Sequence, residues 1–248
     1  MDLQGKVALV TGGGTGLGKE ISLQLAREGA DIAIAYSRSV ADAEATVAEL
    51  KALGRRAAAY KADVSQGAEV DTLLAAVVRD FGGLDVLVND AGYTQFIDFK
   101  DLEGVTEEAW DRIMDVNVKG CFLVSRAAAP ALRKSGHGKI VNITSVSAIR
   151  PGGSSIPYAV SKAAEMMLTK CLAMALAPEI SVNAVAPGLM DTRWGRLWGD
   201  AAFARSEQSA PLGHIATLED IAAAALFLVK NDSMTGQSVV VDSGGYMH

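Results

Sequence analysis

Short runs of β-branched and other apolar residues recur along the chain, and a longer stretch with helical periodicity follows most of them. The runs are apolar on both faces, which is typical of parallel strands covered by helices on both sides. They lie at residues 7–10, 32–35, 57–60, 86–88, 140–143, 181–185 and 238–241. Helical stretches lie at residues 18–28, 41–53, 68–81 and 218–229. This alternation predicts an α/β fold: one doubly wound domain over residues 1–248, with a seven-stranded parallel sheet and helices on both faces.

One segment, residues 191–212, breaks this alternation. It is rich in aromatic and basic side chains, namely Trp194, Trp198, Arg193, Arg196 and Arg205. In an open α/β sheet, an insertion after a strand end is where a cover over a ligand belongs. We predict that this segment is a substrate lid; the alternative is an ordinary surface helix.

Composition narrows the range of partners. The 248 residues are 50% apolar and carry a formal net charge of −6, which argues against nucleic acid or an anionic membrane as the main partner. None of the three histidines has a second ligand at metal-binding spacing, so no metal site is expected. Cys121 and Cys171 lie in apolar stretches, and we expect two buried thiols in a reducing compartment.

The first residues do not have the pattern of a secretory signal, because no basic segment, long apolar stretch and cleavage site follow one another there. The longest apolar window, residues 221–229, is too short to cross a bilayer. We therefore expect a cytoplasmic protein with no membrane partner.

A glycine-rich turn joins the first predicted strand to the first predicted helix. It reads TGGGTGLG over residues 11–18 and fits the pattern TGxxxGxG. Glycine removes side chains where a backbone must approach a pyrophosphate, and the following helix offers free N–H groups to the anion. The alternative is a tight structural turn. The residues predicted to contact the cofactor here are Gly12, Gly14, Thr15, Gly16 and Leu17.

The end of the second strand bears on the choice of cofactor. An acidic residue there would hold the ribose hydroxyls of NAD, but the chain has Tyr36, Ser37 and Arg38 instead. The Arg38 guanidinium suits a 2′-phosphate, and Ser37 adds a hydroxyl. NADP(H) is therefore favoured over NAD(H); the alternative is that Arg38 is a solvated loop residue.

The ends of the third and fourth strands contribute further predicted cofactor contacts. Asp63 and Val64 are expected beside the adenine, and Asn89, Ala91 and Gly92 along the adenosine ribose. Asp90, which lies within the second group, adds a carboxylate near that ribose.

The candidate catalytic group centres on Tyr158 and Lys162. Pro157 marks the start of a helix, and residues four apart share one helix face, so the phenol and the ammonium point the same way. A nearby cation lowers the pKa of a tyrosine, which is otherwise near 10. Ser145 ends a buried strand and is expected to donate to a substrate carbonyl beside Tyr158. Asn117 is either a satisfied buried amide that bends its helix or an anchor for water in a proton path to Lys162.

These residues together resemble the short-chain dehydrogenase/reductase family, over essentially the whole chain. The motifs that carry the resemblance are Thr11-Gly12, Gly16-Leu17-Gly18, Asp63-Val64, Asn89-Asp90-Ala91-Gly92, Asn117, Ser145, Tyr158, Lys162 and the NAVAPG of residues 183–188. The resemblance implies a Rossmann-type fold, a catalytic tetrad of Asn117, Ser145, Tyr158 and Lys162, and a homotetramer. It also implies that Tyr158 and Lys162 contact the cofactor, and that Pro187, Gly188, Leu189 and Thr192 hold the nicotinamide. Two departures are Asp90, where the family usually has asparagine, and Gly14-Thr15 in the glycine loop, where NADP-dependent members often carry a basic residue. The second departure leaves Arg38 as the single obvious partner for the 2′-phosphate and weakens the case for NADP.

The sequence thus predicts hydride transfer between a nicotinamide cofactor and a carbonyl or secondary alcohol, with Tyr158 as general acid/base. Reduction of 3-oxoacyl thioesters or other ketones with NADPH is the leading hypothesis. The alternatives are an NAD-dependent alcohol, diol or sugar dehydrogenase and a non-catalytic cofactor-sensing regulator. The residues that could line an apolar substrate pocket are Phe96, Ile149, Ile156, Trp194, Leu197 and Trp198, and those that could receive an acidic group are Arg150, Arg193 and Arg196.

Overall fold

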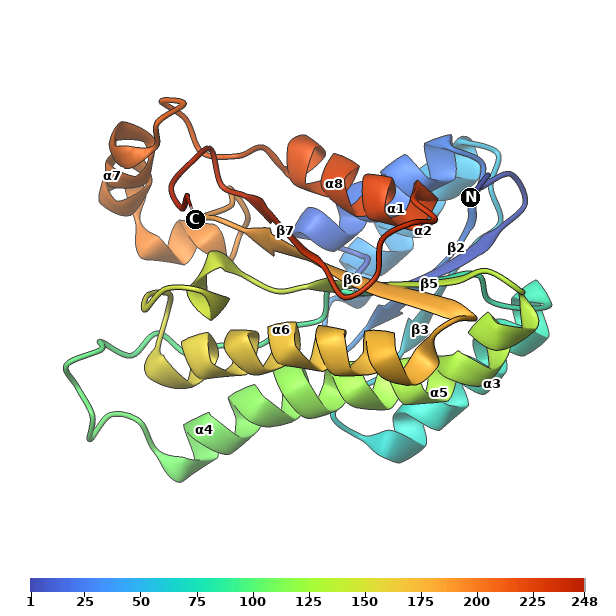
Figure 1. Ribbon diagram of the computed structural model, residues 1–248, viewed down its shortest axis with the longest axis horizontal. Coiled ribbons are helices and arrows are strands. Elements are labelled where there is room, and N and C mark those ends of the chain that lie inside the picture. Colours follow the sequence, from blue (N-terminus) through green and yellow to red (C-terminus); the bar gives the residue numbers. More distant parts are fainter. Residues whose placement is uncertain (248) are drawn as a thin grey trace.

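Seven parallel strands form one sheet in the computed structural model, which describes residues 1–247 (Figure 1). The strands are β1 (Val7–Thr11), β2 (Asp31–Tyr36), β3 (Ala57–Lys61), β4 (Val86–Asn89), β5 (Gly138–Ile143), β6 (Ile180–Pro187) and β7 (Ser238–Val241). Their order is β3-β2-β1-β4-β5-β6-β7, and each neighbouring pair is parallel. The predicted fold class is confirmed, and the seven apolar runs mark the seven strands to within two residues at each end.

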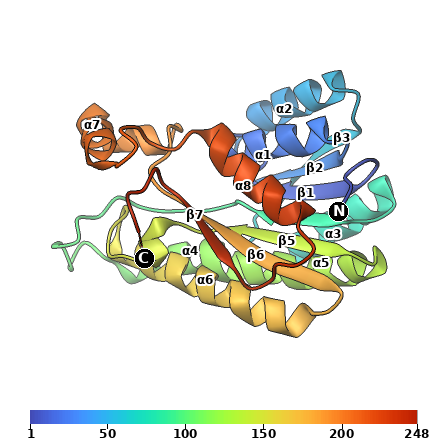
Figure 2. The ribbon, with the colours of Figure 1, turned by 45° about the horizontal axis from the view of Figure 1, so that its top comes forward.

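Successive side chains of each strand enter two separate cores, one on each face of the sheet. In β1, Ala8 and Val10 belong to one core and Leu9 belongs to the other. The first core is closed by α1 (Gly16–Arg27), α2 (Val40–Ala52) and α8 (Leu218–Lys230), and the second by α3 (Gly67–Phe81), α5 (Cys121–Lys134) and α6 (Ile156–Leu176) (Figure 2). Because both faces are covered, every residue of β1, β4 and β5 is buried.

The connection from β3 to β4 determines where a ligand can bind. The chain leaves β3 at the sheet edge and returns to β4 beside β1, so that Thr11 at the end of β1 pairs with both Ala35 and Asn89. Loops on the two sides of this point diverge toward opposite faces and leave a crevice at the carboxyl ends of the strands.

A π-helical turn, η1 (Asp115–Gly120), joins α4 (Glu107–Met114) to α5. Such turns are rare within helices and frequently occur at functional sites. Asn117 lies in this turn and is fully buried, so its amide does lie at a distortion of the helix, which was one of the two interpretations from the sequence.

Residues 191–212 contain two short helices instead of one. They are the 3-10 helix η3 (Gly195–Trp198) and α7 (Asp200–Ser209), and α7 stands apart from the helices that cover the sheet (Figures 1 and 2). Phe203 is the buried residue of α7, and Leu197 is largely exposed.

The expectation of two buried thiols is wrong for one cysteine. Cys121 is buried, but Cys171 is exposed because it lies on the outer side of α6, whereas the next residue, Leu172, faces the core. No helix within residues 1–247 is long and apolar enough to cross a membrane.

The packing of α1 against the sheet and α8 allows a test of the core. Leu25 is fully buried there, so Leu25→Ala removes apolar surface and leaves a cavity. We expect the free energy of unfolding to fall by about 2–5 kcal/mol, measured by denaturant titration. Leu102→Ala is the matched control because Leu102 is 66% exposed, and it should cost about 0.5 kcal/mol or less. Equal losses for the two variants would contradict this account of the core.

Candidate active site

The glycine loop turns tightly between β1 and α1. Gly12 and Gly16 have φ angles of +74° and +52°, in the left-handed region that favours glycine. A Cβ atom added to Gly18 would lie only 2.5 Å from the Gly12 carbonyl oxygen. The side chain of Thr15, the N-cap residue of α1, does not cap the helix, so the N–H groups of the first turn stay available to an anion. The loop therefore fits the pyrophosphate of a dinucleotide.

Arg38 follows β2 and carries an unengaged guanidinium. It stacks 5.9 Å from the centre of the Tyr93 ring and forms no ion pair or side-chain hydrogen bond with any residue of 1–247. Ser37 beside it is exposed, and Tyr36 packs partly against the first core. The end of β2 thus presents an unpaired guanidinium and a hydroxyl, and their contact with a 2′-phosphate stays a prediction.

The side chain of Asp63 is held within the protein. Arg112 of α4 donates to one carboxylate oxygen at 2.9 Å, and Ser65 donates to the other at 2.7 Å from its hydroxyl and 3.0 Å from its backbone. Burial raises the pKa of Asp63, but the Ser65 and Arg112 donors lower it by more, so the net pKa is below its usual value and the carboxyl stays ionised. Val64 is buried against Gly120 of the π-helical turn. This contact ties the end of β3 to α4 and η1.

The side chain of Asn89 turns away from the crevice. Its amide nitrogen donates to Ser125 at 3.0 Å and to Asn142 at 2.9 Å, and Asn142 donates in turn to Thr169 at 2.9 Å. This chain of side chains connects β4, β5, α5 and α6 behind the site. At this position only the backbone of Asn89 and the small residues Ala91 and Gly92 remain to face a cofactor.

Asp90 lies against the glycine loop. Its Oδ2 atom is where a Cβ on Gly18 or Gly12 would collide, at 2.5 and 3.1 Å. Burial raises the pKa of Asp90 to about 8, with Glu165 adding to the rise and Lys162 and the Gly18 N–H opposing it. The Asp90 carboxyl, expected near the ribose, thus lies against the glycine loop, with Lys162 and Glu165 of α6 close enough to shift its pKa.

Local capping signals define the start of helix α6, which carries Tyr158 and Lys162. The hydroxyl of Ser155 caps the helix by accepting from the Tyr158 N–H at 3.4 Å, and Pro157 occupies its first turn. Tyr158 and Lys162 are one turn apart, with Nζ 5.9 Å from the centre of the Tyr158 ring. Ser145, two residues after β5, caps the short helix η2 (Val146–Ala148) and lies with Tyr158 in the wall of one cavity.

The net pKa shift of Tyr158 differs from the sequence-based expectation. Burial raises the pKa of Tyr158, and this outweighs the lowering by the Lys162 cation and the Ser145 hydroxyl; Glu165 and Asp90 raise the pKa further. The predicted influence of Lys162 is present, but two carboxyls that the spacing argument did not include oppose it. The phenol is therefore protonated at neutral pH.

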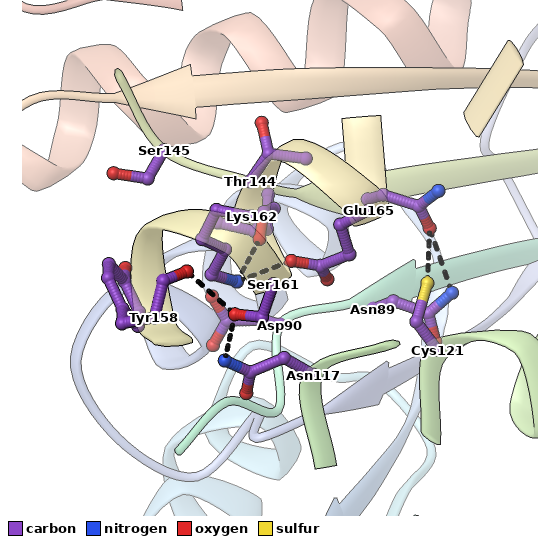
Figure 3. A network of polar contacts seen from close by, with 12 residues as sticks. Asn89, Asp90, Asn117, Cys121, Thr144, Ser145, Tyr158, Ser161, Lys162 and Glu165 are labelled. Carbon is purple, nitrogen blue, oxygen red and sulfur yellow. Dashed lines mark hydrogen bonds and ion pairs between the residues drawn. The ribbon is translucent and has the colours of Figure 1, made fainter. Parts of the chain in front are cut away.

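Lys162 is held from two sides (Figure 3). Its ammonium donates to the Ile143 carbonyl at 2.9 Å and to Glu165 at 2.6 Å. Burial lowers the pKa of Lys162, but Glu165 and Tyr158 raise it by more, so Lys162 stays charged. Glu165 itself is 1% exposed, which makes this a buried ion pair between residues one turn apart on the helix.

Asn117 is fully satisfied by other groups. Its Oδ1 accepts from the Tyr93 N–H at 2.8 Å, and its Nδ2 donates to the Tyr93 carbonyl at 3.0 Å and to Ser161 at 2.9 Å. Ser161 donates to the Tyr158 carbonyl at 2.7 Å. Asn117 therefore links the π-helical turn to the first turn of α6.

The loop after β6 closes the crevice on the side opposite to α6. The Gly188 N–H donates to the Val241 carbonyl of β7 at 3.1 Å, which holds the backbone after Pro187 in place. Thr192 approaches the glycine loop, since a Cβ on Gly16 would lie 3.3 Å from its methyl group. Leu189 and Thr192 both line a cavity beside Tyr158.

A cavity of about 720 Å³ opens beside Tyr158 and Ser145. Three of the expected apolar residues line it: Phe96 and Trp198 pack edge to face at 5.1 Å, and Trp194 packs edge to face on Tyr158 at 6.1 Å. Ile149, Ile156 and Leu197 do not line it. The segment 191–212 supplies nearly half of the wall, namely Thr192, Trp194, Gly195, Trp198, Ala202, Arg205, Ser206, Gln208 and Ser209.

The cavity contains a different set of arginines from the one expected. Arg193 pairs with Asp42 of α2 at 2.8 Å, and Arg196 pairs with Asp191 and Asp200, so their charges are already engaged. Arg150 does line the cavity and donates to the Gly245 carbonyl at 3.0 Å. Arg205 also lines it, and its guanidinium forms no ion pair or hydrogen bond within residues 1–247.

Two further residues near the site, Glu165 and Arg112, were not among those predicted from the sequence. The signal for Glu165 was present, because a glutamate interrupts the apolar face of a helix three residues after Lys162. The partner of Arg112, by contrast, lies 49 positions earlier in the chain and only the fold brings it close. The part of the chain that the structure describes holds no cluster of three or more metal-binding side chains.

Comparison with known proteins identifies the family. The family model for short chain dehydrogenases matches residues 6–201. The chain is 41% identical over 245 residues to a Streptomyces violaceoruber protein assigned as ketoacyl reductase 2 of granaticin polyketide synthase, covering 97% of this chain and 96% of that protein. It is 38% identical over 247 residues to the 3-oxoacyl-(acyl-carrier-protein) reductase FabG of Staphylococcus epidermidis, covering 98% and 99%.

A solved structure gives the same result. A short chain dehydrogenase from Burkholderia cenocepacia, determined in complex with NADP, is 38% identical, with a TM-score of 0.91 and 99% of both chains covered. The chain belongs to the short-chain dehydrogenase/reductase family. It is an NAD(P)-dependent oxidoreductase of carbonyl and alcohol substrates.

The tight contact at Gly18 allows a test of the glycine loop. Gly18→Ala puts a methyl group 2.5 Å from the Gly12 carbonyl and Asp90, so the loop must shift. We expect the Kd for NADPH to rise by about tenfold or more, measured by fluorescence titration, since overpacking of this kind costs roughly 1–3 kcal/mol. Gly67→Ala is the control, because a Cβ there meets nothing within 4 Å and should leave the Kd unchanged. An unchanged Kd for Gly18→Ala would remove the loop from the cofactor site.

Proposed function

We propose that the protein reduces a ketone, of the 3-oxoacyl-thioester kind, with NADPH as the hydride donor and Tyr158 as the proton donor. The observation that carries this proposal is the convergence of Tyr158 and Ser145 on the wall of a cavity at the carboxyl edge of the sheet, with the Lys162 ammonium 5.9 Å from the centre of the Tyr158 ring. The similarity to ketoacyl reductases over nearly the whole chain supports the same substrate class.

Each catalytic side chain has a role that follows from its contacts. The protonated Tyr158 hydroxyl donates to the oxygen of the substrate carbonyl as that oxygen gains negative charge. Ser145 donates a second hydrogen bond to the same oxygen and stabilises it. The Lys162 ammonium would hold the nicotinamide ribose, and its charge favours the tyrosinate that remains after proton transfer. Asn117 positions the first turn of α6 through Ser161.

The cofactor, when bound, supplies a hydride from its reduced nicotinamide ring. Pro187, Gly188, Leu189 and Thr192 would hold that ring, and the glycine loop with Gly12, Gly14, Thr15, Gly16 and Leu17 would hold the pyrophosphate. Arg38 and Ser37 would bind the 2′-phosphate, which is why we favour NADPH. Tyr36, Asp63, Val64, Asn89, Ala91 and Gly92 would border the adenosine.

The substrate would enter beneath residues 191–212, which we propose as its lid. The aromatic side chains of Phe96, Trp194 and Trp198 offer apolar walls for an acyl group. Arg205 offers a free cation to an anionic group carried by the same substrate, such as a phosphate or a carboxylate.

We further propose that the protein is a cytoplasmic homotetramer. Helices α5 and α6 expose several large apolar side chains that are unusual for a solvated surface, namely Phe122, Val160, Met167 and Met174. A second copy of the chain packed on these helices would cover them.

Tyr158→Phe tests the proton donor. The change removes only the hydroxyl, and loss of a general acid costs roughly 10²–10⁴ in rate, so kcat for ketone reduction should fall by that factor. The Kd for NADPH, measured by fluorescence titration, should stay close to that of the wild type. Tyr60→Phe is the matched control, because the Tyr60 hydroxyl bonds Asp80 outside the site and its loss should leave kcat unchanged. Activity near wild type for Tyr158→Phe would refute the proposed role.

Arg38→Ala tests the choice of cofactor. A hydrogen-bonded charge pair with a phosphate contributes about 1.5–3 kcal/mol, so the KM for NADPH should rise by about ten- to a hundredfold. NADH has no 2′-phosphate and serves as the internal control, with little change expected in steady-state assays. Equal losses for the two cofactors would show that Arg38 does not contact the phosphate.

A further inference from the structure

The buried ion pair of α6 has a feature that the proposed mechanism does not use. The mechanism needs the ammonium of Lys162, but the ammonium already has a backbone acceptor in the Ile143 carbonyl at 2.9 Å. Glu165 adds a carboxyl group at 2.6 Å, at a position that is 1% exposed. Burial of a carboxylate is costly, so a structural purpose alone would be served as well by an apolar side chain.

Glu165 is placed to act on the catalytic pair through Lys162. It lies one helical turn beyond Lys162, on the side away from Tyr158, and the ammonium lies between the carboxylate and the phenol (Figure 3). The other titratable groups of this cluster are Asp90, from the end of β4, and Cys121, from the start of α5. Lys162 is therefore the one cation among two carboxyls, a thiol and a phenol.

We propose that Glu165 is a positioning residue that anchors the Lys162 ammonium and offsets its charge at Tyr158, so that the Tyr158 hydroxyl stays protonated and ready to donate. This inference rests on the proposed role of Tyr158 and concerns the tuning of that role. It assigns the site to carbonyl reduction near neutral pH, because a protonated phenol is the form that reduction consumes, whereas alcohol oxidation requires the tyrosinate.

The shifts of the individual groups agree with this arrangement. Burial raises the pKa of Glu165 to about 7, with Lys162 opposing the rise, so the carboxylate is charged in the alkaline range where Tyr158 titrates. The Glu165 charge in turn raises the pKa of Tyr158 and that of Asp90. Removing this charge leaves the Lys162 cation less compensated, and the pKa of Tyr158 should then fall.

Glu165→Gln is the direct test, because it keeps the size and an acceptor oxygen but removes the charge. The holoenzyme is assayed for reduction of acetoacetyl-CoA by NADPH and for oxidation of 3-hydroxybutyryl-CoA by NADP⁺ across the neutral and alkaline range. Reduction declines and oxidation rises as Tyr158 loses its proton, so both kcat profiles should move to lower pH, by about one pH unit or more. Profiles that coincide with those of the wild type, or that move to higher pH, would overturn the proposal.

A matched control separates charge from packing. Thr169 is buried one turn further along α6, where its hydroxyl donates to the Glu165 carbonyl at 2.9 Å and accepts from Asn142. Thr169→Val removes these bonds without any change in charge. We expect a lower melting temperature with both pH profiles unmoved, and a shift equal to that of Glu165→Gln would also overturn the proposal.

Two further measurements keep the test decisive. If Glu165→Gln does not fold, Glu165→Asp retracts the charge from Nζ by one methylene, and its profiles should move in the same direction by a smaller amount; coinciding profiles would refute the inference. If neither thioester is turned over, the pKa of Tyr158 can be followed by its tyrosinate absorbance. The Tyr158→Phe titration is subtracted in each background, and the remaining absorbance should appear at lower pH in Glu165→Gln than in the wild type. An active Tyr158→Phe variant would defeat the proposed function itself, whereas an inactive one with unmoved profiles for Glu165→Gln would defeat only this inference.

Discussion

The position of β1 in the middle of the sheet is the constraint on which the rest of the structure depends. Parallel pairing on both sides of β1 brings the ends of β2 and β4 to the same edge of the sheet. Ala35 and Asn89 both pair with Thr11 there, although 53 residues lie between them in the chain. Because connections between parallel strands are right-handed, the helices on the two sides of β1 cover opposite faces of the sheet. The loops must therefore diverge at the end of β1, and the glycine loop lies at that divergence.

The polar groups behind this edge keep its two halves in register. Asn89, Asn142 and Thr169 form a buried relay from β4 through β5 to α6, and Asp63 holds Arg112 of α4 from the end of β3. Asn117 adds a third link, between the π-helical turn and α6. Buried donors and acceptors are costly when unpaired, so each link favours one arrangement of helix against strand. The position of Tyr158 relative to the crevice follows from these links.

Much of this arrangement could be predicted from the sequence, because it depends on short-range patterns. Continuous apolar runs reveal buried parallel strands, and the residues that follow such runs must lie at one edge, which placed Ser145 and the glycine loop correctly. The partners of polar side chains could not be predicted in this way, since they come from distant segments: Arg193 meets Asp42 across the fold, and Asn117 meets the backbone of Tyr93. The exposure of Cys171 was missed because an apolar neighbourhood in sequence does not say which side of a helix a residue occupies.

The pKa of Tyr158 is the clearest property of the site that short-range sequence patterns could not predict. The spacing of Tyr158 and Lys162 correctly indicates a cation beside a phenol, and in isolation that pair would lower the pKa of the tyrosine. Burial acts on every member of the cluster and favours neutral forms, so the net charge around Tyr158 depends on how many carboxyls share the lysine. Here Glu165 and Asp90 both face it, and the balance tips toward a protonated phenol. In the proposed mechanism, the four predicted catalytic residues define which proton moves, while the buried residues around them decide at which pH that proton is available.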